Sequence, residues 1–132
     1  MKSIQQSIAH INLLVQDYDD AIAFYTQQVG FELLEDTALG NGKRWVRIAP
    51  PNSIGTALLL SKVTKEEQLQ QVGHQAGGKV LLFLQTNDFW RDYQRMKQAN
   101  VHFLEAPREE TYATVVVFED LYGNQWDLLE PK

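Results

Sequence analysis

The sequence predicts an α+β fold in which two paired βαβββ modules form an open curved sheet with a central cavity. Three observations support it: each half runs through a strand, an amphipathic helix and three further strands; each half closes on a similar apolar strand; and a glycine-containing turn precedes that strand. The closing strands are Ala57-Leu58-Leu59-Leu60-Ser61 and Trp126-Asp127-Leu128-Leu129-Glu130. Two such modules are expected to pair about a pseudo-twofold axis, with a cavity at their seam.

The first module begins with a strand over residues 7–15, where apolar and polar positions alternate. Asp17 is suited to cap the following helix, whose buried stripe recurs at helical spacing, and Gly30 to end it in a left-handed conformation. That stripe consists of Tyr18, Ile22, Tyr25 and Val29. Strands are then predicted over 31–36, 44–48 and 56–61, the first two separated by the turn Gly40-Asn41-Gly42.

The second module repeats this order. A strand over 80–86 leads to a helix capped by Asn87 or Asp88, and Asn100 takes the place that Gly30 has in the first module. The helix stripe consists of Phe89, Tyr93 and Met96, and strands are predicted over 102–105, 113–119 and 125–130.

The chain of 132 residues is expected to form one domain, with module one at about 7–61, a linker at 62–78 and module two at about 79–130. Within the linker, Thr64 and Glu67 suggest a capping box for a short helix that ends at Gly73.

Composition excludes several classes of function. A net charge of −5 with dispersed basic residues argues against a nucleic-acid partner. No apolar run is long enough to span a bilayer, no signal peptide is evident, and there is no cysteine, so we expect a cytoplasmic protein without membrane association. Motifs for a phosphate-binding loop, a dinucleotide fold or a serine nucleophile are absent from the sequence.

Two local motifs carry a family resemblance. The first runs from His10-Ile11 through Asp17 and Phe24-Tyr25 to Gly30-Phe31, and the second from Phe118 and Asp120 through Gly123-Asn124 to Glu130. Together they resemble the opening and closing signatures of the vicinal oxygen chelate superfamily. This superfamily includes glyoxalase I, extradiol dioxygenases, and fosfomycin- and bleomycin-resistance proteins. The resemblance covers the chain from about Ile8 to Glu130.

The resemblance implies four inward positions that hold one divalent ion (Zn, Ni, Mn or Fe) in metal-using members. His10 and Glu130 match two of them, as metal ligands or as a proton-transferring catalytic pair. The other two positions carry Ser61 and, depending on register, Lys79, Leu81 or Phe83, none of which is a good ligand. Two protein ligands fall short of the usual three, unless His74, Gln85, His102 or a partner subunit supplies another.

Aromatic side chains indicate where a small molecule would bind. Trp126 precedes Glu130 by four residues, so both lie on one face of the last strand, and we expect Trp126 to form a cavity wall. Trp45, Gln85, Asn12 and Arg47 are further candidates for ligand binding.

These observations favour a bleomycin-resistance-like protein that binds a small, planar or cationic molecule beside an incomplete metal site. The alternative is a divalent-metal-dependent lyase or isomerase of the glyoxalase I type, or a dioxygenase, acting on vicinal oxygens. Whether the protein is an enzyme stays open at this point. The resemblance also implies a homodimer.

Overall fold

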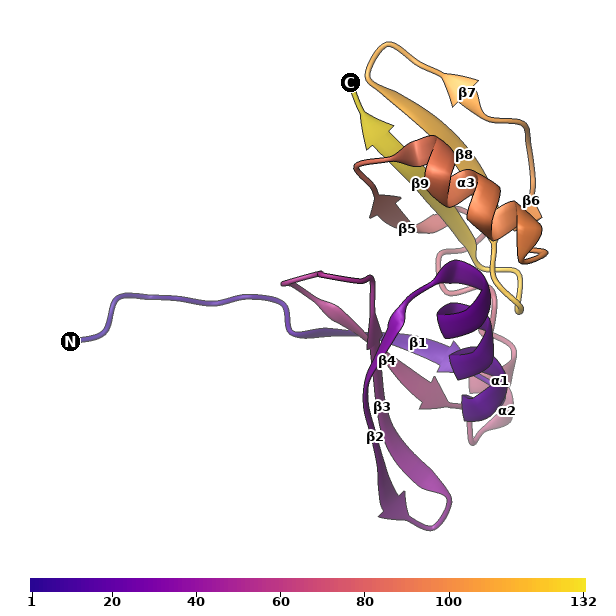
Figure 1. The fold of residues 1–132 in the computed structure, drawn as a ribbon. Helices are drawn as coiled ribbons and strands as arrows, with labels where there is room; N and C mark the ends of the chain where they lie inside the picture. The colour runs from indigo at the N-terminus through magenta and orange to yellow at the C-terminus, as the bar shows by residue number, and fades with distance from the viewer.

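The computed structural model describes residues 1–132 and contains the two predicted modules (Figure 1). The elements of the first are β1 (His10–Val15), α1 (Tyr18–Ala23), η1 (Phe24–Val29), β2 (Glu32–Gly40), β3 (Lys43–Ala49) and β4 (Ala57–Lys62). After α2 (Glu66–Leu69), the second contains β5 (Val80–Gln85), α3 (Phe89–Gln98), β6 (His102–Phe103), β7 (Arg108–Glu109), β8 (Ala113–Glu119) and β9 (Gln125–Pro131).

Each module forms its own sheet with the same topology. The strand order is β1-β4-β3-β2 in the first sheet and β5-β9-β8-β6 in the second. The short strand β7 pairs with the same edge of β8 as β6, opposite β9. In both sheets the first strand lies parallel to the last, and the remaining pairs are antiparallel. A parallel pair needs a crossover connection, and in each module the helix after the first strand begins it. The predicted duplication is therefore confirmed.

Local capping explains where the helices begin and end. Asp17 Oδ2 accepts a hydrogen bond from the backbone N–H of Asp20 at 2.8 Å, and Asp88 Oδ1 accepts one from Arg91 at 3.2 Å. Gly30 and Asn100 both have positive φ, at 98° and 68°. These are the positions at which the sequence predicted a left-handed helix end.

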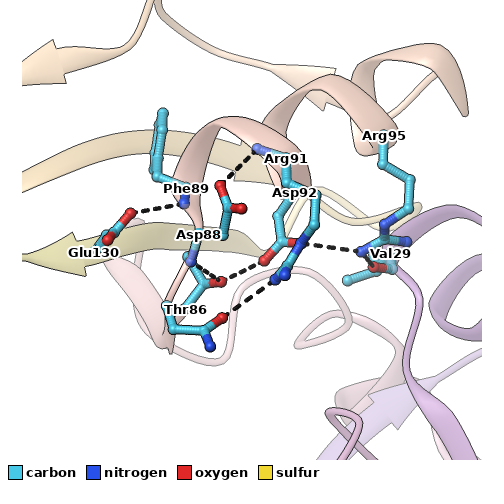
Figure 2. Close-up of polar contacts among 9 residues, drawn as sticks. Val29, Thr86, Asp88, Phe89, Arg91, Asp92, Arg95 and Glu130 are labelled. Atoms are coloured by element: carbon cyan, nitrogen blue, oxygen red, sulfur yellow. Dashed lines mark hydrogen bonds and ion pairs between the residues drawn. The ribbon is translucent and has the colours of Figure 1, made fainter.

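The first helix has a feature that the sequence did not reveal. From Phe24 onward its turns widen into a π-helix, η1, which runs to Val29. At its end, Arg95 of α3 donates a hydrogen bond from Nη2 to the carbonyl oxygen of Val29 at 3.0 Å (Figure 2). A Cβ atom on Gly30 would overlap the guanidinium of Arg95, so the glycine also permits this contact between the two modules.

The helices cover one face of each sheet and create a hydrophobic core that continues across both modules. Phe118 and Trp126, from neighbouring strands of the second sheet, stack with their ring centroids 5.8 Å apart. Phe31 and Tyr25 of the first module lie against Trp126, with centroids 5.7 and 5.9 Å from it. Aromatic residues from both halves therefore pack together in this part of the core.

Two details differ from the sequence expectations. The strand expected over 102–105 ends at Phe103, because the chain then turns outward before β7 joins β8. The helix after residue 64 ends at Leu69 rather than at Gly73, and it is capped by Gln68 rather than Glu67. Gln68 Oε1 accepts from the N–H groups of Thr64 and Lys65, at 2.8 and 3.3 Å. An amide side chain one residue further along therefore takes the capping role.

The outer edge of β1 is bound by a side chain instead of a strand. Gln75 Oε1 accepts from the N–H of Leu14 at 2.7 Å, and its Nε2 donates to the carbonyl oxygen of Asn12 at 3.0 Å. Before β1, residues 1–9 are exposed and extend away from the body of the molecule (Figure 1). None of the helices is both long enough and apolar enough to cross a membrane.

Candidate ligand-binding faces

Each sheet has a second face that carries no helix, which we call its open face. Leu13 and Val15 of β1 point into the core, whereas His10 and Asn12 are exposed. The same alternation assigns side chains in the other strands. The open face of the first sheet carries His10, Asn12, Trp45, Arg47, Leu59 and Ser61, and that of the second carries Phe83, Gln85, Val117, Asp127 and Leu129.

The open face of the first sheet brings together four residues that the sequence singled out. The rings of His10 and Trp45 meet edge to face, with centroids 5.6 Å apart. Asn12 Oδ1 accepts a hydrogen bond from the hydroxyl of Ser61 at 2.8 Å. Arg47 Nε donates to Glu35 Oε1 at 3.0 Å, and this bond lowers the pKa of Glu35. The face thus combines an aromatic surface with fixed polar groups.

The open face of the second sheet is more apolar. Phe83 is 65% exposed and lies beside Asp127 in the parallel ladder between β5 and β9. Gln85, which the sequence predicted to bind the ligand, pairs in register with Leu129. On the other side of Asp127 lies Val117 of β8.

Asp127 is the residue of this face that sequence reasoning missed. Its Oδ1 is the only buried side-chain nitrogen or oxygen in the chain that has no hydrogen-bond partner. Burial raises the pKa of Asp127, against the opposing charge of Arg108, while Glu105 raises it further. Arg108 itself donates to Glu105 Oε2 at 2.9 Å and to Glu110 Oε1 at 2.8 Å. In the sequence, Asp127 could have been recognised as a carboxylate between two apolar residues, Trp126 and Leu128, which are buried.

Trp126 and Glu130 share a face of β9, as predicted, but it is the face that α3 covers. Trp126 is 3% exposed, lies in the core and donates from Nε1 to the hydroxyl of Tyr25 at 3.2 Å, so it is not a cavity wall. Glu130 Oε1 accepts the backbone N–H of Phe89, at the start of α3, at 2.8 Å (Figure 2). Side chains two residues apart in a strand lie on the same face of the sheet, but this alternation does not reveal which face a helix covers.

This position of Glu130 predicts a structural role. The Glu130→Ala variant is expected to lose about 1 kcal/mol of unfolding free energy, because the first turn of α3 loses both an acceptor and a negative charge at its N-terminus. Glu130→Gln keeps an acceptor and should lose less than half of that. Urea denaturation followed by circular dichroism measures both. Equal stability of the alanine variant and the wild type would contradict this role.

The residues of a single chain do not fit a divalent metal site. No group of three or more His, Asp or Glu side chains is placed to hold an ion. His10 lies on the open face of the first sheet, whereas Glu130 lies on the helix-covered side of the second. His102 contacts Glu119 at the far side of β8, and His74 lines a separate pocket of about 120 Å³ with Lys79. A catalytic metal usually has three protein ligands, which these positions do not supply together.

A buried polar network joins the modules on the helix-covered side. Asp120 Oδ2 accepts from the hydroxyl of Tyr25 at 2.6 Å and from Asn124 Nδ2 at 2.9 Å. Its Oδ1 accepts from the backbone N–H groups of Tyr122 and Asn124, both at 2.9 Å. Burial, and then the charge of Asp120, hold the pKa of Tyr25 well above its ordinary value. The Asp120 side chain therefore meets four donors and belongs to the fold rather than to a ligand site.

Comparison with known proteins agrees with this architecture. An uncharacterized protein of Shewanella frigidimarina (strain NCIMB 400) is 54% identical over 128 residues, covering 96% of this chain and 95% of its own. The crystal structure of UcmS2 superposes with a TM-score of 0.83 at 28% identity, covering 96% of this chain and 98% of its own. TnmS3, an antibiotic binding protein from Streptomyces sp. CB03234, has a TM-score of 0.77 at 26% identity, with both chains fully covered.

The family model matches nearly the whole chain. It describes the Glyoxalase/Bleomycin resistance protein/Dioxygenase superfamily and covers residues 7–128, from just before β1 into β9. Together with the paired βαβββ modules, this match establishes that the chain belongs to the Glyoxalase/Bleomycin resistance protein/Dioxygenase superfamily.

Proposed function

We propose that this protein binds a planar aromatic small molecule on its open sheet faces and acts as a binding protein rather than a metal-dependent enzyme. The observation that carries the proposal is the grouping of His10, Asn12, Trp45 and Arg47 on one face that no helix covers. A flat aromatic surface bordered by polar groups is suited to stacking a planar ligand and orienting it through hydrogen bonds.

The relatives support the same reading. TnmS3, which resembles this chain over its full length, is described as an antibiotic binding protein. Fold alone does not decide function, so the argument depends on the side chains of the open faces. Within one chain these faces carry no three-ligand metal set, and this favours small-molecule binding over a glyoxalase-like or dioxygenase-like activity.

We also propose that the protein forms a homodimer in which the open face of the first sheet of one copy and the open face of the second sheet of the other enclose one ligand between them. A single sheet face provides only one wall, while small-molecule sites bury most of the ligand. Phe83, at 65% exposure, is a large apolar side chain that such a contact would cover. Sedimentation equilibrium is expected to give twice the chain mass of 15.2 kDa, and a monomer at micromolar concentration would contradict it.

Binding is tested with three ring-matched probes at pH 8: 9-aminoacridine as a cation, acridine as a neutral compound, and acridine-9-carboxylate as an anion. Isothermal titration calorimetry is expected to show saturable binding of at least one. Trp45→Ala should weaken that binding about tenfold, because a stacked ring is worth about 1 kcal/mol or more.

The control is Trp90→Ala, which removes a half-exposed tryptophan from α3, on the covered side of the second sheet. It should leave the dissociation constant unchanged. If none of the three probes saturates the protein, the proposed function is wrong. If Trp90→Ala weakens binding as much as Trp45→Ala, the ligand does not lie on the open face of the first sheet.

A further inference from the structure

The starting point is an unmet hydrogen bond on the open face of the second sheet. Asp127 Oδ1 is buried without a donor, although the carboxyl group as a whole is only partly covered. Buried polar atoms nearly always have a partner, because leaving one unpaired costs free energy. A residue that keeps such a cost is a candidate for a contact that forms only when a ligand arrives.

The neighbours of Asp127 do not supply that contact. The charge of Arg108 acts on Asp127, but two carboxylates hold the Arg108 guanidinium, Glu105 at 2.9 Å and Glu110 at 2.8 Å. No ion pair joins Arg108 to Asp127, and the charge of Glu105 disfavours ionisation of Asp127. The charges of Glu105, Glu110 and ionised Asp127 outnumber the single charge of Arg108, so the region is negative and attracts a cation more than an anion.

The surroundings of the carboxylate would strengthen an ion pair. In register on either side lie apolar side chains, Phe83 of β5 and Val117 of β8. Apolar neighbours lower the local dielectric, so a charge pair formed there is stronger than one in water. The exposed ring of Phe83 also offers a stacking surface one strand away from the carboxylate.

We propose that Asp127 makes this protein selective for cationic ligands, by pairing its carboxylate with an N–H group of a protonated aromatic amine, such as an aminoacridinium, whose ring rests against Phe83. This inference depends on the proposed function, small-molecule binding at the open faces, and adds to it the chemical class of the ligand. Asp127 is then a specificity-determining residue, and Phe83 supports the ring that carries the amine.

Selectivity among the three acridines tests the inference. With chelator-treated wild-type protein at pH 8, 9-aminoacridine should bind at least tenfold more tightly than acridine, and acridine-9-carboxylate most weakly. Asp127→Asn preserves the shape of the side chain and removes its charge. It should abolish the advantage of the cation while leaving the affinity for acridine within twofold.

The matched control is Asp19→Asn, which removes the same charge from an exposed position of α1, on the covered side of the first module. It should leave the ratio of affinities unchanged. If Asp127→Asn keeps the preference for the cation, or if the anion binds as tightly as the cation, this inference is overturned and small-molecule binding stands. If no probe binds, the proposed function and the inference both fail.

A measurement without ligand checks the unpaired carboxylate itself. Because the pKa of Asp127 is raised by burial, the folded protein loses stability as pH rises through the ionisation of this group. Asp127→Asn has no such loss, so its melting temperature should exceed that of the wild type by a few degrees at pH 8 and by less at pH 4. A lower melting temperature of the variant at pH 8 would show that the carboxylate already has a stabilising partner.

Discussion

Replacing Trp126 with alanine is expected to lower the free energy of unfolding by about 3–5 kcal/mol. The indole is 3% exposed, stacks on Phe118 and contacts Tyr25 and Phe31 of the other module. Its removal leaves a cavity where the two halves meet, and deprives the Tyr25 hydroxyl of the Nε1 donor. Urea denaturation followed by far-ultraviolet circular dichroism measures the loss.

Trp45→Ala is the matched control, because it removes the same side chain from an open face. It should change the unfolding free energy by less than about 1 kcal/mol, as expected for a partly exposed position outside the core. If Trp126→Ala keeps the unfolding free energy of the wild type but abolishes acridine binding, Trp126 lines a cavity and its assignment to the core is wrong.

Asp120→Ala is expected to cost about 3 kcal/mol or more, since each buried donor left unpaired costs about 1–3 kcal/mol. The substitution deprives the Tyr25 hydroxyl, Asn124 Nδ2 and two backbone N–H groups of their acceptor at once. These donors come from both modules, so the transition should remain a single cooperative step at a lower urea midpoint. Chemical denaturation followed by tryptophan fluorescence provides the measurement.

Tyr25→Phe removes only one of those donors and serves as its comparison. Asp120 keeps three hydrogen bonds in this variant but Trp126 Nε1 loses its acceptor, so the expected loss is about 2 kcal/mol. If Asp120→Ala is no less stable than Tyr25→Phe, the remaining donors find other partners and the network does not hold the modules together.

Local signals allowed most of the fold to be predicted. Asp17 and Asp88 accept hydrogen bonds at the helix starts, and Gly30 and Asn100 have positive φ at the ends, because these interactions involve residues close in the sequence. β7 was not predicted. Its two residues have no apolar pattern of their own and become a strand only by pairing with β8.

The candidate site was predicted only in part, and the reason is geometric. Alternation correctly placed Trp126 and Glu130 on one face of β9, but which face α3 covers is a long-range property that alternation cannot reveal. On β1 and β3, the candidate residues His10, Asn12, Trp45 and Arg47 lie together on the face that no helix covers, and their role in ligand binding stays a prediction. On β9 the residues predicted from the sequence lie on the face that α3 covers, so Asp127 on the opposite face was missed. Asp127 lies between two core residues.

The side chain of Gln75 has a consequence for how the protein behaves at high concentration. Its amide offers one acceptor and one donor to β1, as a peptide unit of a neighbouring strand would. Unpaired strand edges are templates on which other chains add as strands and aggregate. Gln75 occupies this edge with a group that has no further backbone to extend, so strand addition stops there. A single amide thereby protects this edge of β1 against fibril-like association.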